Sequence, residues 1–258
     1  MFFKRKYISR FSIVVLLFIG HNLFGQSQDT LKVLFVGNSY TYFWNMPQTV
    51  QAMAESKGKV LMARKSTAGG TTLKQHWNGD KELHSKEMIK KGNWDIVVLQ
   101  NHSLSSIEGY DDFMEYGGKF IDLVKEYGAK PILYVTWARQ YNPLMQEQIS
   151  KAYATLAKKY NIDYVPVGPI WARVRKLRPD LNLFAEDKSH PSTVGTYLIA
   201  CTFYHVFTGL PATGLPERVK IKDKNNEDLY LSIMSKETAS FIQQAVDEYF
   251  SKNEPITK

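Results

Sequence analysis

The architecture of this chain is set by the segment LKVLFVGNS, residues 31–39. Residues 31–36 have strand character, because apolar side chains dominate them. Gly37 and Asn38 then supply a turn, and Ser39 stands just before an expected helix start. A strand that passes through a short turn into a helix is the repeating unit of a parallel α/β sheet.

Further segments along the chain repeat this alternation. Strand character returns at residues 60–65, 95–99, 131–135 and 162–167. Helical patterns span residues 47–57, 111–127, 143–160, 193–208 and 236–249. Segments 95–99 and 131–135 are almost continuously apolar, as central strands are, whereas 60–65 is weaker and is expected near an edge. We therefore predict an α/β fold with a mostly parallel five-stranded sheet, the last helix packed on it, and a polar loop over residues 211–226.

The N-terminal residues predict export. Four basic residues precede a nearly unbroken apolar run over residues 11–20, and the small Gly25 suits a cleavage point. The run is too short for a membrane-spanning helix, which needs about 20 apolar residues, although an uncleaved anchor is the alternative. We expect residues 1–25 to be a secretory signal peptide, so that the mature form has no membrane span and is periplasmic or secreted. Residues 26–258 would then form a single domain.

Charge and cysteine content argue against several classes of protein. The formal net charge is +8, but the signal segment supplies four of the positive charges and the remaining lysines lie among acidic residues, so no nucleic-acid partner is expected. Cys201 is the only cysteine and excludes an internal disulfide. The sequence has no compact metal-ligand spacing and no glycine motif for phosphates or dinucleotides, so we expect no metal and no cofactor.

Candidate site residues follow four of the five predicted strands. They are Ser39, Gly69 and Gly70, Asn101 and His102, and residues 137–139. The carboxyl ends of parallel strands meet at one edge of a sheet, where such folds bind ligands. These residues are therefore expected to line one rim.

A serine hydroxyl is a weak nucleophile until a base removes its proton. His190 is the candidate base for Ser39, because Asp187 lies three residues before it and a tight turn can bring that carboxylate to Nδ1 while Nε2 faces outward. The carboxylate would fix the tautomer and stabilise the imidazolium. The alternative is a helix-capping serine, a turn-capping aspartate and a surface histidine.

An ester hydrolase also needs hydrogen-bond donors where negative charge develops on the carbonyl oxygen. The backbone N–H of Ser39, that of Gly69 or Gly70, and the side-chain amide of Asn101 are candidates. Ordinary turns and a capped loop are the alternatives for the glycines and the asparagine.

The four sequence blocks GNS at 37–39, GGT at 69–71, Asn101, and DKSH at 187–190 resemble those of the SGNH, or GDSL-like, hydrolase superfamily. The resemblance covers nearly the whole mature chain. It implies a flavodoxin-like three-layer α/β/α sandwich, and an esterase that needs no metal. It further implies that Ser39 is the nucleophile, with His190 as base and Asp187 orienting it. The oxyanion hole would combine the N–H groups of Ser39 and Gly69 with the Asn101 amide.

Two blocks depart from the superfamily pattern. Asn38 replaces the usual aspartate before the serine, and residues 99–102 read LQNH where Gly-x-Asn-Asp is common. Gln100 could therefore share or take over the donor role, and His102 could contact the substrate.

Aromatic and polar residues near the rim point to a carbohydrate substrate. Trp44, Asn45, Trp137 and Arg139 are the candidates for binding it. Aromatic rings suit the apolar faces of sugars, and no long apolar lid is visible to cover a fatty chain. We therefore predict a serine esterase acting through an acyl-serine intermediate on short acyl esters, such as O-acetyl groups of a small molecule or polysaccharide. The alternatives are a lipase or thioesterase, an acyltransferase with the same triad, and a catalytically silent carbohydrate-binding relative.

Overall fold

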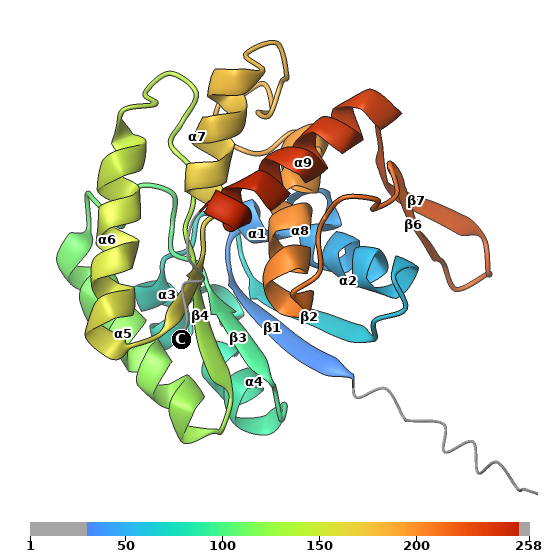
Figure 1. Ribbon diagram of the computed structural model, residues 1–258. Coiled ribbons are helices and arrows are strands. Elements are labelled where there is room, and N and C mark those ends of the chain that lie inside the picture. Colours follow the sequence, from blue (N-terminus) through green and yellow to red (C-terminus); the bar gives the residue numbers. More distant parts are fainter. Residues whose placement is uncertain (1–29, 253–258) are drawn as a thin grey trace, which may run out of the picture.

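The computed structural model describes residues 30–252, which form a parallel sheet covered by helices on both faces (Figure 1). The expected signal peptide, residues 1–25, lies outside the described residues. The strands are β1 (Leu31–Gly37), β2 (Leu61–Thr67), β3 (Ile96–Leu99), β4 (Lys130–Tyr134) and β5 (Asp163–Val165). Their order is β2-β1-β3-β4-β5, and all four pairings are parallel.

β1 lies inside the sheet, where Val33 is in register with Ala63 of β2 and with Ile96 of β3. Its residues 33–36 are fully buried, because helices cover both of its faces. The weakest predicted strand, β2, is at an edge, as its sequence indicated. The prediction of a five-stranded parallel sheet is therefore confirmed.

Helices form two layers around the sheet. They are α1 (Ser39–Tyr42), α2 (Met46–Ser56), α3 (Leu73–Asn78), α4 (Ser85–Lys91), α5 (Tyr110–Glu126), α6 (Met145–Tyr160), α7 (Val167–Leu177), α8 (Thr193–Thr208) and α9 (Lys236–Lys252), with 3-10 turns η1 (Phe43–Asn45) and η2 (Asp80–Glu82). Side chains of α2, α7, α8 and α9 share one hydrophobic core, and those of α3 to α6 share the other. The result is a three-layer α/β/α sandwich.

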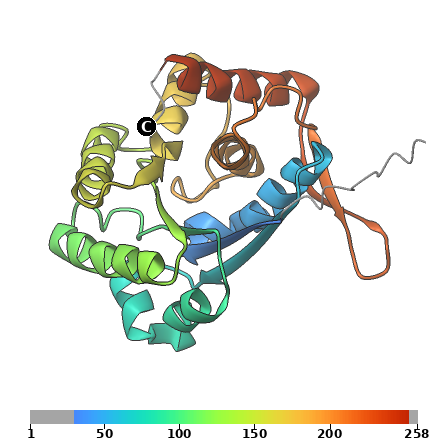
Figure 2. The same cartoon turned by 60° about the horizontal axis from the view of Figure 1, so that its bottom comes forward.

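Several features differ from the sequence-based expectation, and α3, α4 and α7 are helices in segments for which none was predicted. Residues 211–226 are not all loop, because β6 (Arg218–Lys222) pairs antiparallel with β7 (Asp228–Ile233) in a hairpin that projects from the body (Figure 2). α9 packs mainly on α7 and α8, and so lies outside the layer that touches the sheet. None of the helices in residues 30–252 combines the length and apolar character needed to cross a membrane.

α8 fixes the segment that precedes it. The Ser192 hydroxyl caps the helix by accepting the Gly195 N–H at 3.1 Å. A side chain at Gly195 would meet the Leu183 carbonyl at 2.2 Å and the Trp171 ring at 2.5 Å, so only glycine lets the chain pass this closely. Residues 183–192 are thereby held against the carboxyl edge of the sheet.

Candidate active site

Ser39 begins α1 directly after the turn that ends β1. The turn requires glycine at position 37, because an added Cβ would lie 2.4 Å from Gln100 Oε1 and 2.5 Å from Thr41 Oγ1. Asn38 caps the helix, since its Oδ1 accepts the Tyr40 N–H at 3.0 Å. Ser39 itself is 8% exposed, at the edge of the sheet where the expected rim lies.

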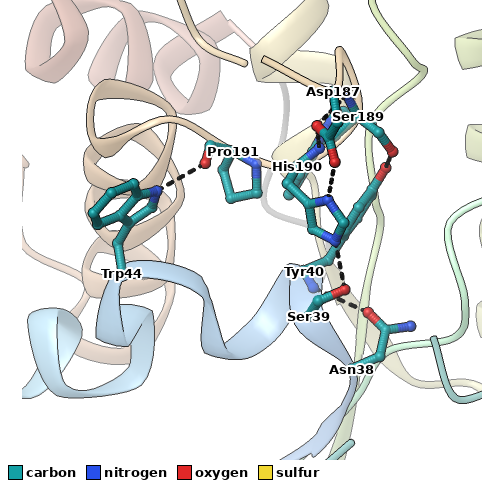
Figure 3. A network of polar contacts seen from close by, with 9 residues as sticks. Asn38, Ser39, Tyr40, Trp44, Asp187, Ser189, His190 and Pro191 are labelled. Carbon is teal, nitrogen blue, oxygen red and sulfur yellow. Dashed lines mark hydrogen bonds and ion pairs between the residues drawn. The ribbon is translucent and has the colours of Figure 1, made fainter. Parts of the chain in front are cut away.

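The structure brings the hydroxyl of Ser39 and the imidazole of His190 together (Figure 3). Ser39 Oγ and His190 Nε2 are 2.7 Å apart, within direct proton-transfer reach. His190 Nδ1 is hydrogen-bonded to Asp187 Oδ2 on its other side. Because a carboxylate only accepts, Nδ1 carries the proton and Nε2 is free to act as a base.

Asp187 is oriented by its own turn. Its Oδ1 accepts the backbone N–H groups of Ser189 at 3.0 Å and of His190 at 2.9 Å. Lys188, between Asp187 and Ser189, adopts a left-handed conformation that closes this turn. Partial burial would raise the pKa of the Asp187 carboxyl, but the hydrogen bonds from His190 and Ser189 outweigh it and hold the pKa below its ordinary value. The carboxylate is therefore ionised at neutral pH, as an orienting group must be.

Aromatic residues of α1 and η1 hold the loop that carries His190. The Tyr40 hydroxyl is hydrogen-bonded with Ser189 Oγ at 2.6 Å, and Trp44 Nε1 donates to the Pro191 carbonyl at 3.0 Å. The Phe43 ring stacks on the imidazole of His190, with centroids 4.2 Å apart. The segment after the nucleophile thus positions both partners of the proton transfer.

Trp137 lies in the core rather than at the rim. Its side chain is fully buried and stacks between Tyr40, at 4.4 Å, and Trp171, at 4.3 Å. Its Nε1 donates to the Ser189 carbonyl at 3.0 Å. The prediction that Trp137 contacts the substrate is therefore wrong, because its ring supports the loop of the histidine from beneath.

Gln100 also supports the site from behind. Its Oε1 accepts the Asn38 N–H at 2.8 Å and the Thr41 hydroxyl at 3.0 Å, while Nε2 donates to the Asn101 carbonyl. The side chain is fully buried, and both its amide oxygen and its amide nitrogen are hydrogen-bonded to neighbouring groups. The expectation that Gln100 binds substrate or acts as an oxyanion donor is therefore wrong, because this side chain fixes the turn before Ser39.

Asn101 is oriented for donation. Its Oδ1 accepts the Leu73 N–H at 2.9 Å, which fixes the amide and leaves Nδ2 without an acceptor among the described residues. The glycine loop lies beside the nucleophile, because Asn38 Nδ2 donates to the Thr71 carbonyl at 2.9 Å. A Cβ on Gly69 would lie 3.4 Å from Tyr42 Oη, whereas one on Gly70 would meet nothing within 4 Å. Gly69 is therefore the glycine that faces α1.

His76 is a buried part of the site that the sequence did not single out for this role. Its Nε2 is hydrogen-bonded with the Gly37 carbonyl at 2.8 Å, and its Nδ1 with Ser85 Oγ at 2.7 Å. Burial lowers the pKa of His76 to about 4, although the bond with Gly37 opposes this shift. A neutral imidazole thus fixes the turn before the nucleophile. No helix was predicted between residues 70 and 95, so nothing in the sequence pattern indicated this contact.

The remaining candidates lie around the opening. Trp44 is 49% exposed, and Asn45 is exposed beside it. Arg139 is partly exposed, and its Nη1 donates to the Tyr141 hydroxyl at 2.9 Å. His102 is partly buried next to Ser105, and its pKa is lowered by burial and by the positive charge of Arg139. These four are placed where a substrate could reach them.

Comparisons with known proteins bear on the fold. No family model and no curated protein matches the sequence. Among solved structures, a DUF4886 family protein from Bacteroides uniformis has a TM-score of 0.70 at 19% identity, covering 88% of this chain and 98% of that one. A protein assigned to the SGNH hydrolases, from Slackia heliotrinireducens, has a TM-score of 0.59 at 23% identity and covers 69% of this chain and 100% of its own length.

The chain has the SGNH hydrolase fold. An acetylxylan esterase from Geobacillus stearothermophilus shares it, with a TM-score of 0.55 at 15% identity over 69% of this chain and 94% of that one. The SGNH-like resemblance of the sequence blocks is therefore confirmed at the level of the fold. In this SGNH-fold chain the first and last blocks meet at one edge of the sheet, although Ser39 and His190 are 151 positions apart in the sequence.

Proposed function

We propose that this chain is a serine ester hydrolase with Ser39 as nucleophile. The observation that carries the proposal is the hydrogen-bonded series from Ser39 Oγ through His190 to Asp187. A serine that only capped a helix would have no need of an imidazole 2.7 Å from its oxygen, itself oriented by a carboxylate.

The geometry supports a two-step mechanism. Ser39 Oγ attacks the ester carbonyl while its proton passes to His190 Nε2, and Asp187 stabilises the imidazolium. His190 then returns the proton to the leaving alcohol, which departs and leaves an acyl-serine. Water, deprotonated by His190, attacks the acyl carbon and releases the acid and the free serine.

The oxyanion formed in each step needs fixed donors. The Ser39 and Gly69 N–H groups and Asn101 Nδ2 are our candidates, and loss of one such donor costs about 100-fold or more in rate. The bond between Asn101 Oδ1 and the Leu73 N–H supports this role, because it holds the amide in one orientation before substrate arrives.

We infer short acyl esters on carbohydrate as the substrate class. The site is open, since the side chains of His190 and Asp187 are 26% and 48% exposed, and an open site suits a short acyl group. The exposed Trp44 offers an aromatic surface of the kind that binds sugar rings. Structural neighbours that include acetylxylan esterases support the same class. Export through residues 1–25 would bring the enzyme to such substrates.

Hydrolysis of p-nitrophenyl esters tests the proposal. Wild type should cleave the acetate faster than the octanoate, and Ser39→Ala should abolish turnover of both. Ser251→Ala, at the exposed end of α9, is the matched control and should behave as wild type. Equal rates in wild type and Ser39→Ala would remove the hydrolase proposal. Faster cleavage of the octanoate would favour a lipase or thioesterase instead.

A further inference from the structure

The segment that follows β4 lies against the loop of the candidate base. The Gln140 N–H donates to the Lys188 carbonyl at 2.9 Å, and Trp137 Nε1 donates to the Ser189 carbonyl. Arg139 therefore lies in the chain between two residues, Trp137 and Gln140, that are hydrogen-bonded to the loop of His190. The positive charge of Arg139 acts on Tyr40 and on His102. The guanidinium thus lies within electrostatic reach of the residues that directly follow Ser39 and Asn101.

Arg139 has no ionic partner in the part of the chain that the structure describes. No carboxylate of residues 30–252 lies within ion-pair distance of it. Nη1 donates to the Tyr141 hydroxyl, and Nε is buried without an acceptor. Glu108 is an acid whose charge reaches Arg139, and its side chain is exposed. The remaining N–H groups of this partly buried guanidinium are therefore available to bind an anion.

A second arginine contacts the same segment. Arg175 of α7 donates from Nη2 to the Gln140 carbonyl at 2.9 Å, and it also lacks an ion pair with any described carboxylate. This bond to the Gln140 carbonyl uses only one of the N–H donors of Arg175. The segment over residues 139–141 therefore carries one arginine and is contacted by a second, and neither forms an ion pair with a described carboxylate, which makes this part of the rim attractive to anions.

We propose that Arg139 binds a carboxylate of the sugar that carries the ester, so that the preferred substrate is an O-acylated acidic sugar. The inference rests on the proposed hydrolase function and names its substrate class. A planar guanidinium matches a carboxylate with two parallel hydrogen bonds, which a lysine cannot reproduce. The Tyr141 hydroxyl, on a side chain that is 64% exposed, holds the guanidinium in place from the solvent side.

A pair of substrates that differ only in charge tests this inference. The probes are the O-acetylated methyl glycoside of a uronic acid with a free carboxylate and the same compound as its methyl ester. Wild type should have a kcat/KM about tenfold or more higher for the free acid, since hydrogen bonds between charged groups are of that strength. Release of acetate is measured, and the ratio of the two rates does not depend on the fraction of folded enzyme.

Substitutions of Arg139 should change this ratio. Arg139→Gln should bring it close to one, and Arg139→Lys should give an intermediate value, because the charge is kept and the fork is lost. Arg218→Gln, on the exposed β6 strand, is the matched control and should keep the wild-type ratio.

Three results would overturn the inference: equal rates for the two probes in wild type, an unchanged preference in Arg139→Gln, or no cleavage of either probe by an enzyme that cleaves p-nitrophenyl acetate. Failure of the hydrolase proposal is distinguished from these by p-nitrophenyl acetate, because that proposal fails only if its hydrolysis does not depend on Ser39.

Discussion

His76 shows how one buried residue links the site to the stability of the fold. Both ring nitrogens are hydrogen-bonded, with the Gly37 carbonyl and Ser85 Oγ, in a place that water does not reach. Burial favours the neutral ring, so the folded protein resists a proton that the unfolded chain accepts readily. The turn that presents Ser39 is therefore sensitive to acid, although His76 takes no part in the proposed chemistry.

Stability is expected to fall as the pH drops through the window between the unfolded and folded pKa values of His76. The unfolded pKa is near 6.5 and the folded value is about 4, so in that range the unfolded chain binds more protons and stability is lost on acidification. The loss should reach about 2 kcal/mol between pH 7 and pH 5. Urea unfolding at the two pH values measures it.

His76→Gln should lower stability at pH 7 but flatten this pH dependence, because glutamine cannot titrate. The exposed His84→Gln is the control and should keep the wild-type slope. If His76→Gln kept the full slope, other groups would be responsible for it.

At the scale of elements, α1 and η1 do more than carry the nucleophile. Tyr40, Phe43 and Trp44 contact the loop over residues 187–191 by a hydroxyl, a stacked ring and an indole N–H. Trp137, after β4, supports the same loop from the core. The distance between nucleophile and base is thus set by several contacts, which α1, η1 and the segment after β4 make with the loop.

Tyr40→Phe tests this positioning, because it removes the bond with Ser189 and keeps the ring stacked on Trp137. We expect kcat/KM for p-nitrophenyl acetate to fall about five- to tenfold, as loss of one hydrogen bond allows the loop to move. Tyr230→Phe, on the exposed hairpin, should leave the rate unchanged. A wild-type rate in Tyr40→Phe, with only the thermal midpoint lowered, would show that the hydroxyl stabilises the fold without positioning the base.

The elements that the sequence predicted well are those with unambiguous ends. α8 begins and ends at the predicted residues, because Ser192 caps it and Gly209 ends it in a left-handed conformation. The β6–β7 hairpin was missed because lysines at positions 220 and 222 hide the alternation of Val219 and Ile221 in a segment that reads as polar.

At the scale of the whole molecule, the sheet order brings distant blocks to one edge. β1 and β3 are neighbours, so Ser39 and Asn101 follow adjacent strands, and the loop between α7 and α8 places His190 beside Ser39. This gathering was predictable, because each block follows a strand or precedes a helix in the sequence. The burial of Trp137 and Gln100 could not be predicted, because it depends on which residues near the site are covered by tertiary packing.

Covalent labelling with a fluorophosphonate is the most direct test of the claim that folding creates an activated serine here. We predict one adduct per chain, mapped by mass spectrometry to Ser39, with hydrolysis lost in step with labelling. We also expect His190→Ala to be labelled far more slowly, because no base then takes the proton from the hydroxyl. Full ester hydrolysis by a chain whose Ser39 stays unlabelled, or an adduct on a different serine, would contradict the claim.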